Sequence, residues 1–264
     1  RSSRMLVNHP IQEKIIVFAL AVGCCVGCSK KAGSAINAGA VLVVRNEDGR
    51  PFTIRVDKVE HDPTDKDGDV FLYTVSAQNQ DGSWTDYCLP DKDGRRTAIP
   101  LAGYWNDRLE RVDQEGVITL ACTNGVLAKC VRWGYKPWKV VNGVSLRDYH
   151  QACTRMVRAD YCGNGHAHTR EGTVIDVYDR LGVQVQDRSA GLAFEAGWSP
   201  DGATYVKRTR YAQTLDSLVA ECPEKLGGRT SRDLPEQDDK AVASRFPETL
   251  LFNESRVTRE AAED

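Results

Sequence analysis

The stretch VLVVRNEDGRPFTIRVDKVEHDPTDKDGDVFLYTV (41–75) decides the fold class of this chain. It contains three apolar runs of strand length: VLVV (41–44), FTIRV (52–56) and VFLYTV (70–75). Asp-Gly pairs separate or follow these runs: 48–49, 67–68, 81–82 and 93–94. Because glycine accepts the positive φ of a tight turn, each pair indicates a hairpin. The sequence therefore predicts a β-rich, antiparallel part over residues 41–115.

After residue 116, the apolar residues recur with the spacing of a helix instead of that of a strand. Leu127, Cys130 and Val131 would share a face of a first helix that Gly134 ends. A second helix would begin at Ser145 as its N-cap, with an apolar stripe that includes Cys153 and with Gln151, Arg155 and Arg158 facing outward. A third would carry Leu215, Leu218, Val219 and Cys222 on one face before Pro223 stops it. An α+β part over 116–226 follows, so the fold class expected is α+β: an antiparallel β-rich domain with three short helices, stapled by disulfides.

The last part of the chain, residues 227–264, is charged and interrupted by prolines. Only LLF (250–252) forms an apolar island there. Such a composition buries little apolar surface, and we therefore expect a largely disordered tail.

The N-terminal segment predicts export. Ile15 to Gly27 is an apolar run too short to span a bilayer, and it ends at Cys28. Val26-Gly27-Cys28 is similar to the end of a bacterial lipobox, whose cysteine is lipidated, although Cys24 is a second candidate. We expect a lipoprotein-type signal over 1–28 and a flexible tether over 29–40. Cleavage with release, or an uncleaved anchor, remain alternatives.

Six cysteines lie beyond this segment: Cys88, Cys122, Cys130, Cys153, Cys162 and Cys222. An even set in an exported chain predicts a disulfide framework, whose connectivity sequence alone leaves open. Such bonds persist in the periplasm, at the cell surface or in secreted proteins.

Composition narrows the classes of partner. Lys and Arg number 35 against 37 Asp and Glu, so no overall positive field attracts nucleic acid. The N-terminal lipid makes a membrane the expected partner, and an envelope polymer or a protein is a further candidate.

A resemblance to a known family rests on residues 158–162, RADYC. This segment resembles the signature of the ADYC domain family of bacterial secreted proteins and lipoproteins. The flanking stretches are similar as well: AKCVRWGYKPW (128–138), HQACTRMVRADYCG (150–163) and TVIDVYD (173–179). The resemblance extends over about 70–225. It implies that Cys162 belongs to a recurrent framework and that an N-terminal signal or lipid is usual, but it implies no catalytic residue or cofactor.

Cys162 with His166 and His168 is the sharpest chemical motif, since an imidazole can hold a nearby thiol as a nucleophilic thiolate. Pairing of Cys162 in a disulfide is the preferred interpretation. His166 and His168 could also form half of a zinc site, with Asp160 or His150 as the third ligand. Because no HExxH or paired CxxC spacing accompanies them, we expect polar loop histidines and no metal.

Two other clusters of residues suggest ligand binding, but each also has a structural interpretation. Asp62, Asp65, Asp67 and Asp69 suggest calcium, but glycine stands in the wrong place for an EF-hand, which favours a solvated hairpin tip. The segment 129–139 alternates four cations with three aromatic residues: Lys129, Arg132, Lys136 and Lys139 with Trp133, Tyr135 and Trp138. The segment could bind a glycan through its rings and cations. We prefer the interpretation that the aromatic residues belong to the core and that the cations are solvated.

No GxSxG, Walker A or dinucleotide fingerprint is present. The function expected is that of an extracytoplasmic envelope lipoprotein that acts as a binding or structural module. A secreted hydrolase using a Cys/His pair or histidine-bound zinc around residues 160–168 is the alternative, so the sequence leaves enzymatic activity open.

Overall fold

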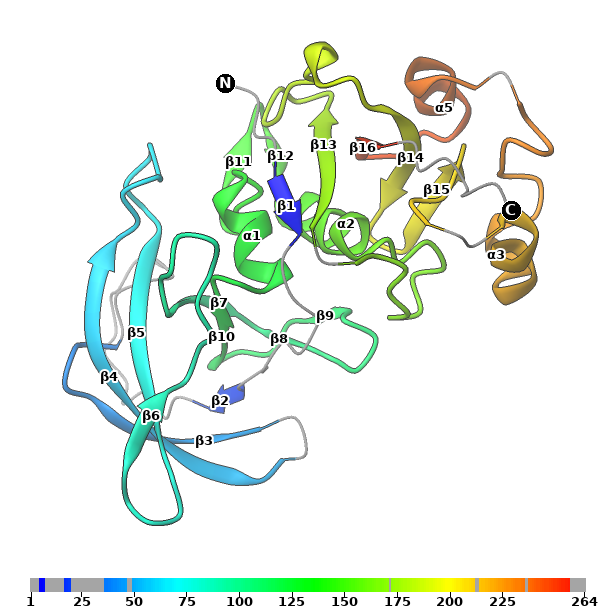
Figure 1. The fold of residues 1–264 in the computed structure, drawn as a ribbon. Coiled ribbons are helices and arrows are strands. Elements are labelled where there is room, and N and C mark those ends of the chain that lie inside the picture. Colours follow the sequence, from blue (N-terminus) through cyan, green and yellow to red (C-terminus); the bar gives the residue numbers. More distant parts are fainter. Residues whose placement is uncertain are drawn as a thin grey trace, which may run out of the picture. The chain divides into compact units, whose positions relative to one another are not determined.

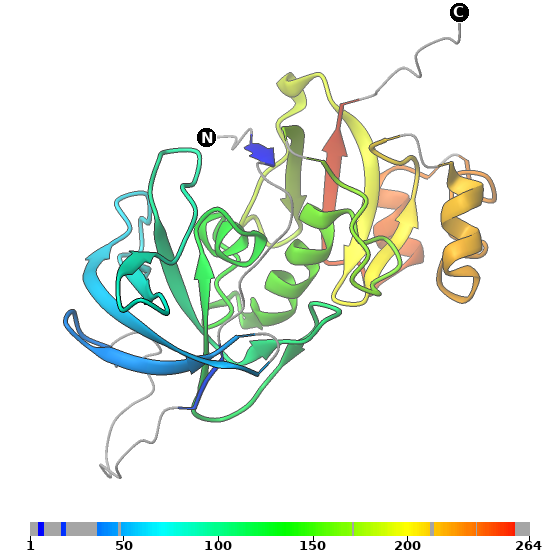
Figure 2. The ribbon, with the colours of Figure 1, turned by 60° about the horizontal axis from the view of Figure 1, so that its bottom comes forward.

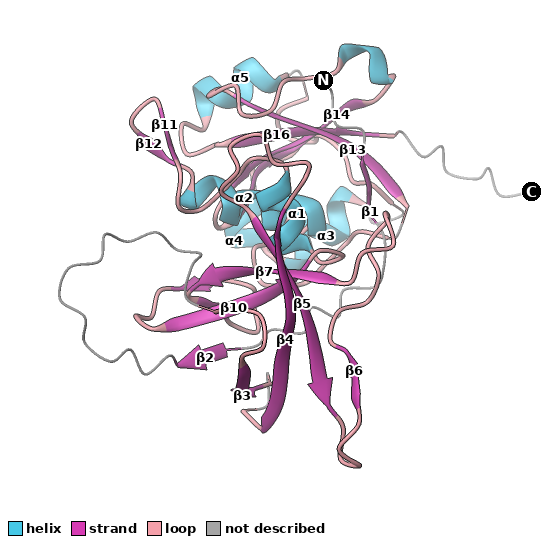
Figure 3. Cartoon of the chain, turned by 90° about the vertical axis from the view of Figure 1, so that its left-hand side faces the viewer, coloured by secondary structure: helices cyan, strands magenta, loops and turns pink. Residues whose placement is uncertain are grey.

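The computed structural model describes residues 5–7, 17–19, 36–46, 49–170, 172–211, 214–235 and 237–256. Strands predominate, the strands of each sheet pair antiparallel, and the helices are short (Figure 3). The predicted α+β fold class is confirmed. The chain divides into two compact units, residues 11–132 and residues 1–10 with 133–264. Among the described residues, no helix has the length and apolar character needed to cross a membrane.

The unit of residues 11–132 is built on one sheet, in the order β4-β3-β2-β10-β7-β5-β6, and β4 also pairs with β5 (Figure 1). Its strands are β2 (Val17–Ala19), β3 (Val41–Arg45), β4 (Pro51–His61), β5 (Phe71–Gln78), β6 (Trp84–Asp86), β7 (Thr97–Ala102) and β10 (Val117–Cys122). A small ribbon, β8 (Tyr104–Trp105) with β9 (Arg111–Val112), and helix α1 (Val126–Arg132) complete it. Alternate apolar side chains such as Ile54, Val56, Tyr73 and Val75 form its core.

The beginning of this unit differs from the expected tether over 29–40. Ile36 is buried in the core, and the Gly39 N–H donates to the Val56 carbonyl at 2.8 Å. Burial of one large apolar side chain thus draws residues 36–40 into the fold. Val17–Ala19 of the predicted signal is strand β2, paired with β10. The rest of Ile15 to Gly27, with Cys24 and Cys28, lies outside the described residues, so the signal stays a prediction.

The second unit has a sheet in the order β1-β13-β16-β14-β15. Its strands are β1 (Met5–Val7), β13 (Thr173–Asp179), β14 (Ala193–Ser199), β15 (Gly202–Val206) and β16 (Leu251–Ser255). The remaining elements are β11 (Val140–Val141), β12 (Val144–Ser145), α2 (Arg147–Arg158), the 3-10 helix η1 (Arg188–Ala190), α3 (Leu215–Glu221), α4 (Pro223–Leu226) and α5 (Asp239–Arg245). Helices α2 and α5 cover opposite faces of this sheet (Figure 3).

The expected disordered tail over 227–264 is wrong for the residues that the structure describes. β16 lies between β13 and β14, where both of its edges are hydrogen-bonded (Figure 2). Val242 of α5 and Phe246, the C-cap of this helix, pack in a cluster with Phe252. A few well-spaced apolar residues therefore suffice to anchor a segment whose average composition is polar.

The helices also differ in detail from those that the sequence predicts. Five α-helices rather than three occur in the described ranges, because Pro223 begins α4 and α5 lies in the expected tail. Leu146, not Ser145, is the N-cap of α2. Gln151, Arg155 and Arg158 are buried instead of facing outward. Helix α2 is buried on nearly all sides, so the polar side chains on its predicted outer face need hydrogen bonds or ion pairs inside the protein.

Candidate functional site

Helix α2 ends in a tight left-handed turn at Ala159, which has φ 51° and ψ 42°. The Ala159 N–H donates to the Met156 carbonyl at 3.0 Å, and the Asp160 N–H donates to the Arg155 carbonyl at 2.9 Å. These two bonds form a Schellman motif, in which glycine is the usual residue at the left-handed position. The small, fully buried side chain of Ala159 takes that place here.

The Asp160 carboxylate holds the loop that follows. Its Oδ2 accepts a hydrogen bond from the Gly165 N–H at 3.0 Å and forms an ion pair with Arg155 Nη1 at 2.5 Å. Arg158 in turn donates to the Gly165 carbonyl at 2.6 Å. Two buried arginines of α2 and one carboxylate therefore fix the backbone of residues 160–165.

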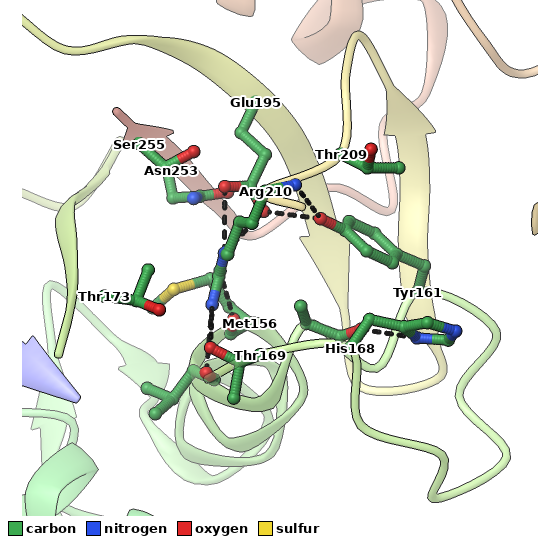
Figure 4. Close-up of polar contacts among 12 residues, drawn as sticks. Met156, Tyr161, His168, Thr169, Thr173, Glu195, Thr209, Arg210, Asn253 and Ser255 are labelled. Atoms are coloured by element: carbon green, nitrogen blue, oxygen red, sulfur yellow. Dashed lines mark hydrogen bonds and ion pairs between the residues drawn. The ribbon is translucent and has the colours of Figure 1, made fainter. Parts of the chain in front are cut away.

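Tyr161 points into a buried polar network (Figure 4). Its hydroxyl donates to Glu195 Oε1 at 3.0 Å, and its ring stacks on Trp198 with the centroids 5.2 Å apart. Burial, followed by the negative charge of Glu195, raises the pKa of Tyr161 well above its usual range. The phenol is therefore a neutral hydrogen-bond donor at any physiological pH.

Arg210 completes this network. Its Nε contacts both Glu195 oxygens, at 2.8 and 2.9 Å, and both side chains are at least 99% buried. Its Nη atoms donate to the Met156 and Val157 carbonyls in the last turn of α2. A cation suits this position because the carbonyl end of a helix is electronegative. Arg210 thus joins the end of α2 to the sheet (Figure 4).

Cys162 is disulfide-bonded to Cys222, with an S–S distance of 2.04 Å. A second disulfide joins Cys88 to Cys122 in the other unit, and Cys130 and Cys153 are disulfide-bonded as well. The framework predicted from the even cysteine count is present. A sulfur atom in a disulfide cannot act as the thiolate nucleophile, so the Cys162/His pair is excluded as a catalytic dyad in this state.

The loop after Cys162 packs closely on the turn between β14 and β15. A Cβ on Gly163, which has φ 71°, would lie 1.8 Å from the Asp201 carbonyl oxygen. The Ala203 N–H donates to the Tyr161 carbonyl at 2.9 Å. Only glycine fits position 163, and the loop is held against the sheet on that side.

His166 and His168 converge on Glu221, the residue before Cys222. His166 Nδ1 lies 3.0 Å from Glu221 Oε1, and His168 Nε2 lies 3.1 Å from Glu221 Oε2. His168 is buried, whereas His166 and Glu221 reach solvent. The alternate spacing of the two histidines does bring them to one side, as the sequence predicted, but neither Asp160 nor His150 joins the cluster found among the described residues.

The acidic hairpin tip is organised by its own backbone. Asp65 accepts hydrogen bonds from the backbone N–H groups of Asp69 and Val70, at 2.9 and 3.0 Å. Asp62 is buried and forms an ion pair with Arg132 Nε at 2.8 Å. The carboxylates of Asp65, Asp67 and Asp69 do lie near one another, but Asp65 is engaged in shaping the turn, which favours the hairpin interpretation.

The aromatic segment at 129–139 is largely internal. Trp133 and Tyr135 are buried, and the Tyr135 hydroxyl donates to Asp179 at 2.8 Å. Burial, and then the charge of Asp179, raises the pKa of Tyr135. The cations are not merely solvated, because Lys136 is only 2% exposed and Arg132 is in an ion pair. Trp133 and Tyr135 are therefore not available to grip a glycan, whereas Trp138 is only partly buried.

Sequence reasoning missed Glu195, Arg210 and Glu221. The first two lie in a strand and a loop whose local pattern gives no sign of burial. Glu221 could have been identified from the sequence if the pairing of Cys162 with Cys222 had been known. It precedes Cys222, so that disulfide places it beside the histidine loop.

Comparison with known proteins gives one match. The model of the ADYC domain family matches residues 37–212. No curated protein and no solved structure matches the chain. The match begins at residue 37, earlier than the expected 70, and ends before α3. The β-rich N-terminal part therefore belongs to the matched domain, whereas Glu221 and Cys222 follow it.

Proposed function

The chain belongs to the ADYC domain family, and on that basis we propose that it is an exported module of the bacterial cell envelope that acts by binding or by structural support. An N-terminal lipid on Cys28 would attach it to a membrane. The partner would be an envelope polymer or another envelope protein.

The Cys162–Cys222 disulfide is the observation that carries this proposal. Disulfides persist in oxidising compartments and are rare in the bacterial cytosol. The signature residues moreover all have structural partners: Ala159 closes α2, Asp160 pairs with Arg155, Tyr161 bonds to Glu195, and Cys162 is crosslinked. A signature engaged in this way supports a scaffold role better than catalysis by its own side chains.

Lipid labelling tests the proposed anchor. In bacteria that express the full chain and are fed radiolabelled palmitate, we expect label on the wild type and on Cys24→Ala. Cys28→Ala should lose the label, because no other cysteine would occupy the cleavage position. Fractionation should place the labelled protein with membranes.

Two outcomes would count against the proposal. Label that disappears with Cys24→Ala and persists with Cys28→Ala would move the anchor to Cys24. An unlabelled wild type recovered in the cytosol would remove export itself.

A further inference from the structure

Three side chains of the types that bind zinc, two histidines and one glutamate, meet in the second unit. His166 Nδ1, His168 Nε2 and one carboxylate oxygen of Glu221 all lie within 4.8 Å of one another. We propose that these three atoms bind one Zn²⁺ ion and leave a fourth position open to solvent or to a ligand. This inference goes beyond the proposed envelope role and does not depend on it.

The orientation of His168 supports a ligand role. Its Nδ1 lies 3.1 Å from the Ala159 carbonyl, which can only accept, so Nδ1 carries a hydrogen. Nε2 is then the free nitrogen of the neutral ring, and it faces a carboxylate that also only accepts. Two acceptors 3.1 Å apart need a cation between them, either a proton or a metal ion. Metal-bound histidines commonly donate their other N–H to a carbonyl in this way.

The spacing of the ligand atoms suits a tetrahedral ion. Zinc bonds of about 2.0–2.2 Å to nitrogen and oxygen place neighbouring ligands about 3.3 Å apart. His166 Nδ1 lies 3.0 Å from Glu221 Oε1 and His168 Nε2 lies 3.1 Å from Glu221 Oε2, so whichever oxygen binds the ion already stands near that distance from one nitrogen. The three ligand atoms lie within 4.8 Å of one another. His166 is exposed, with 63% of its side-chain surface accessible, so its ring can make the adjustment without disturbing the core.

The fold holds the three residues together before any ion arrives. The Cys162–Cys222 disulfide fastens the end of α3 to the histidine loop directly beside Glu221. Asn164 Nδ2 donates to Glu221 Oε1 at 3.0 Å, and Asn164 Oδ1 accepts from the His166 N–H at 2.9 Å. Such an arrangement lowers the entropy cost of assembling a site.

The chemistry of the three ligand side chains also points to zinc. Two imidazoles and one carboxylate form a donor set suited to zinc rather than to the all-oxygen cations magnesium and calcium.

Metal titration of the full, oxidised chain tests this site. Free cysteines are first blocked with N-ethylmaleimide, so that Cys24, Cys25 and Cys28 cannot contribute thiolates. Zinc chloride titrated by calorimetry should then show one ion per chain. Cobalt(II) in place of zinc should give the visible absorption of a tetrahedral complex, a readout that needs no assay of activity.

Variants locate the ligands. His166→Ala and Glu221→Gln change exposed groups and should each weaken zinc binding by about 100-fold or more, because a direct ligand matters at least as much as its supporting partners. His61→Ala is the matched control, since His61 is an exposed histidine of the other unit, and its binding should equal that of the wild type. Unchanged far-ultraviolet circular dichroism would show that each variant folds. Equal zinc binding by His166→Ala and the wild type, or no stoichiometric binding by the wild type, would overturn the proposal.

Discussion

Replacing Arg210 with methionine should lower the free energy of unfolding by about 3–5 kcal/mol. The substitution keeps much of the side-chain volume but leaves the Glu195 carboxylate, which is fully buried, without its cation. It also removes the donors to the Met156 and Val157 carbonyls at the end of α2. Chemical denaturation, with circular dichroism as the signal, measures the loss.

Three controls separate the ion pair from other effects. Tyr161→Phe removes the hydrogen bond to Glu195 and the one that the hydroxyl accepts from the Arg210 N–H, and should have a smaller cost of about 2 kcal/mol. Arg188→Met, at an exposed arginine of η1, should have almost no effect. Glu195→Met combined with Arg210→Met should cost less than the sum of the two single changes, because no buried charge is then left alone. An Arg210→Met protein as stable as the wild type would mean that this network does not hold α2 on the sheet.

Removal of the Cys162–Cys222 disulfide, through serine at both positions, should cost about 4 kcal/mol. The bond closes a loop with a sequence separation of 60, and in the chain-entropy model such a loop contributes that amount. This is a large share of the roughly 5–15 kcal/mol that stabilises an ordinary domain. Denaturation without reductant is the measurement.

The Cys88–Cys122 disulfide provides the matched control. Its sequence separation is 34, so serine at both of its positions should cost nearly as much stability. Zinc binding should distinguish the two changes. Loss of the 162–222 bond should weaken zinc binding, because Glu221 is no longer fastened to the histidine loop, whereas loss of the 88–122 bond should leave zinc affinity unchanged. Equal zinc affinity in both variants would contradict the role given to the 162–222 bond.

The sequence predicted those features that depend on local pattern. The runs at 41–44 and 52–56 lie in β3 and β4, and all but the first residue of the run at 70–75 lies in β5, since alternating apolar residues and Asp-Gly turns act over a few residues. The second helix and the presence of disulfides followed in the same way. The predicted ends of helices and strands were less accurate, as the N-cap of α2 shows, because competing local hydrogen bonds differ by small free energies.

Features that depend on distant partners could not be predicted. Strand β16 has an ordinary polar neighbourhood in the sequence, and only its place between β13 and β14 makes it a central strand. Arg155 and Arg210 resemble surface residues until Asp160 and Glu195 are known to face them. The same holds for Glu221, which is more than fifty residues from the two histidines it meets.

The thiol state of Cys162 in protein taken directly from cells tests the central claim most directly. Intact cells are lysed in denaturant with iodoacetamide and without reductant, and the peptides are then mapped by mass spectrometry. The account predicts a crosslinked peptide that contains Cys162 and Cys222, and no alkylated Cys162. Alkylated Cys162 in most of the protein would contradict the account, because the signature cysteine would then be a free thiol and not part of the framework of an exported domain.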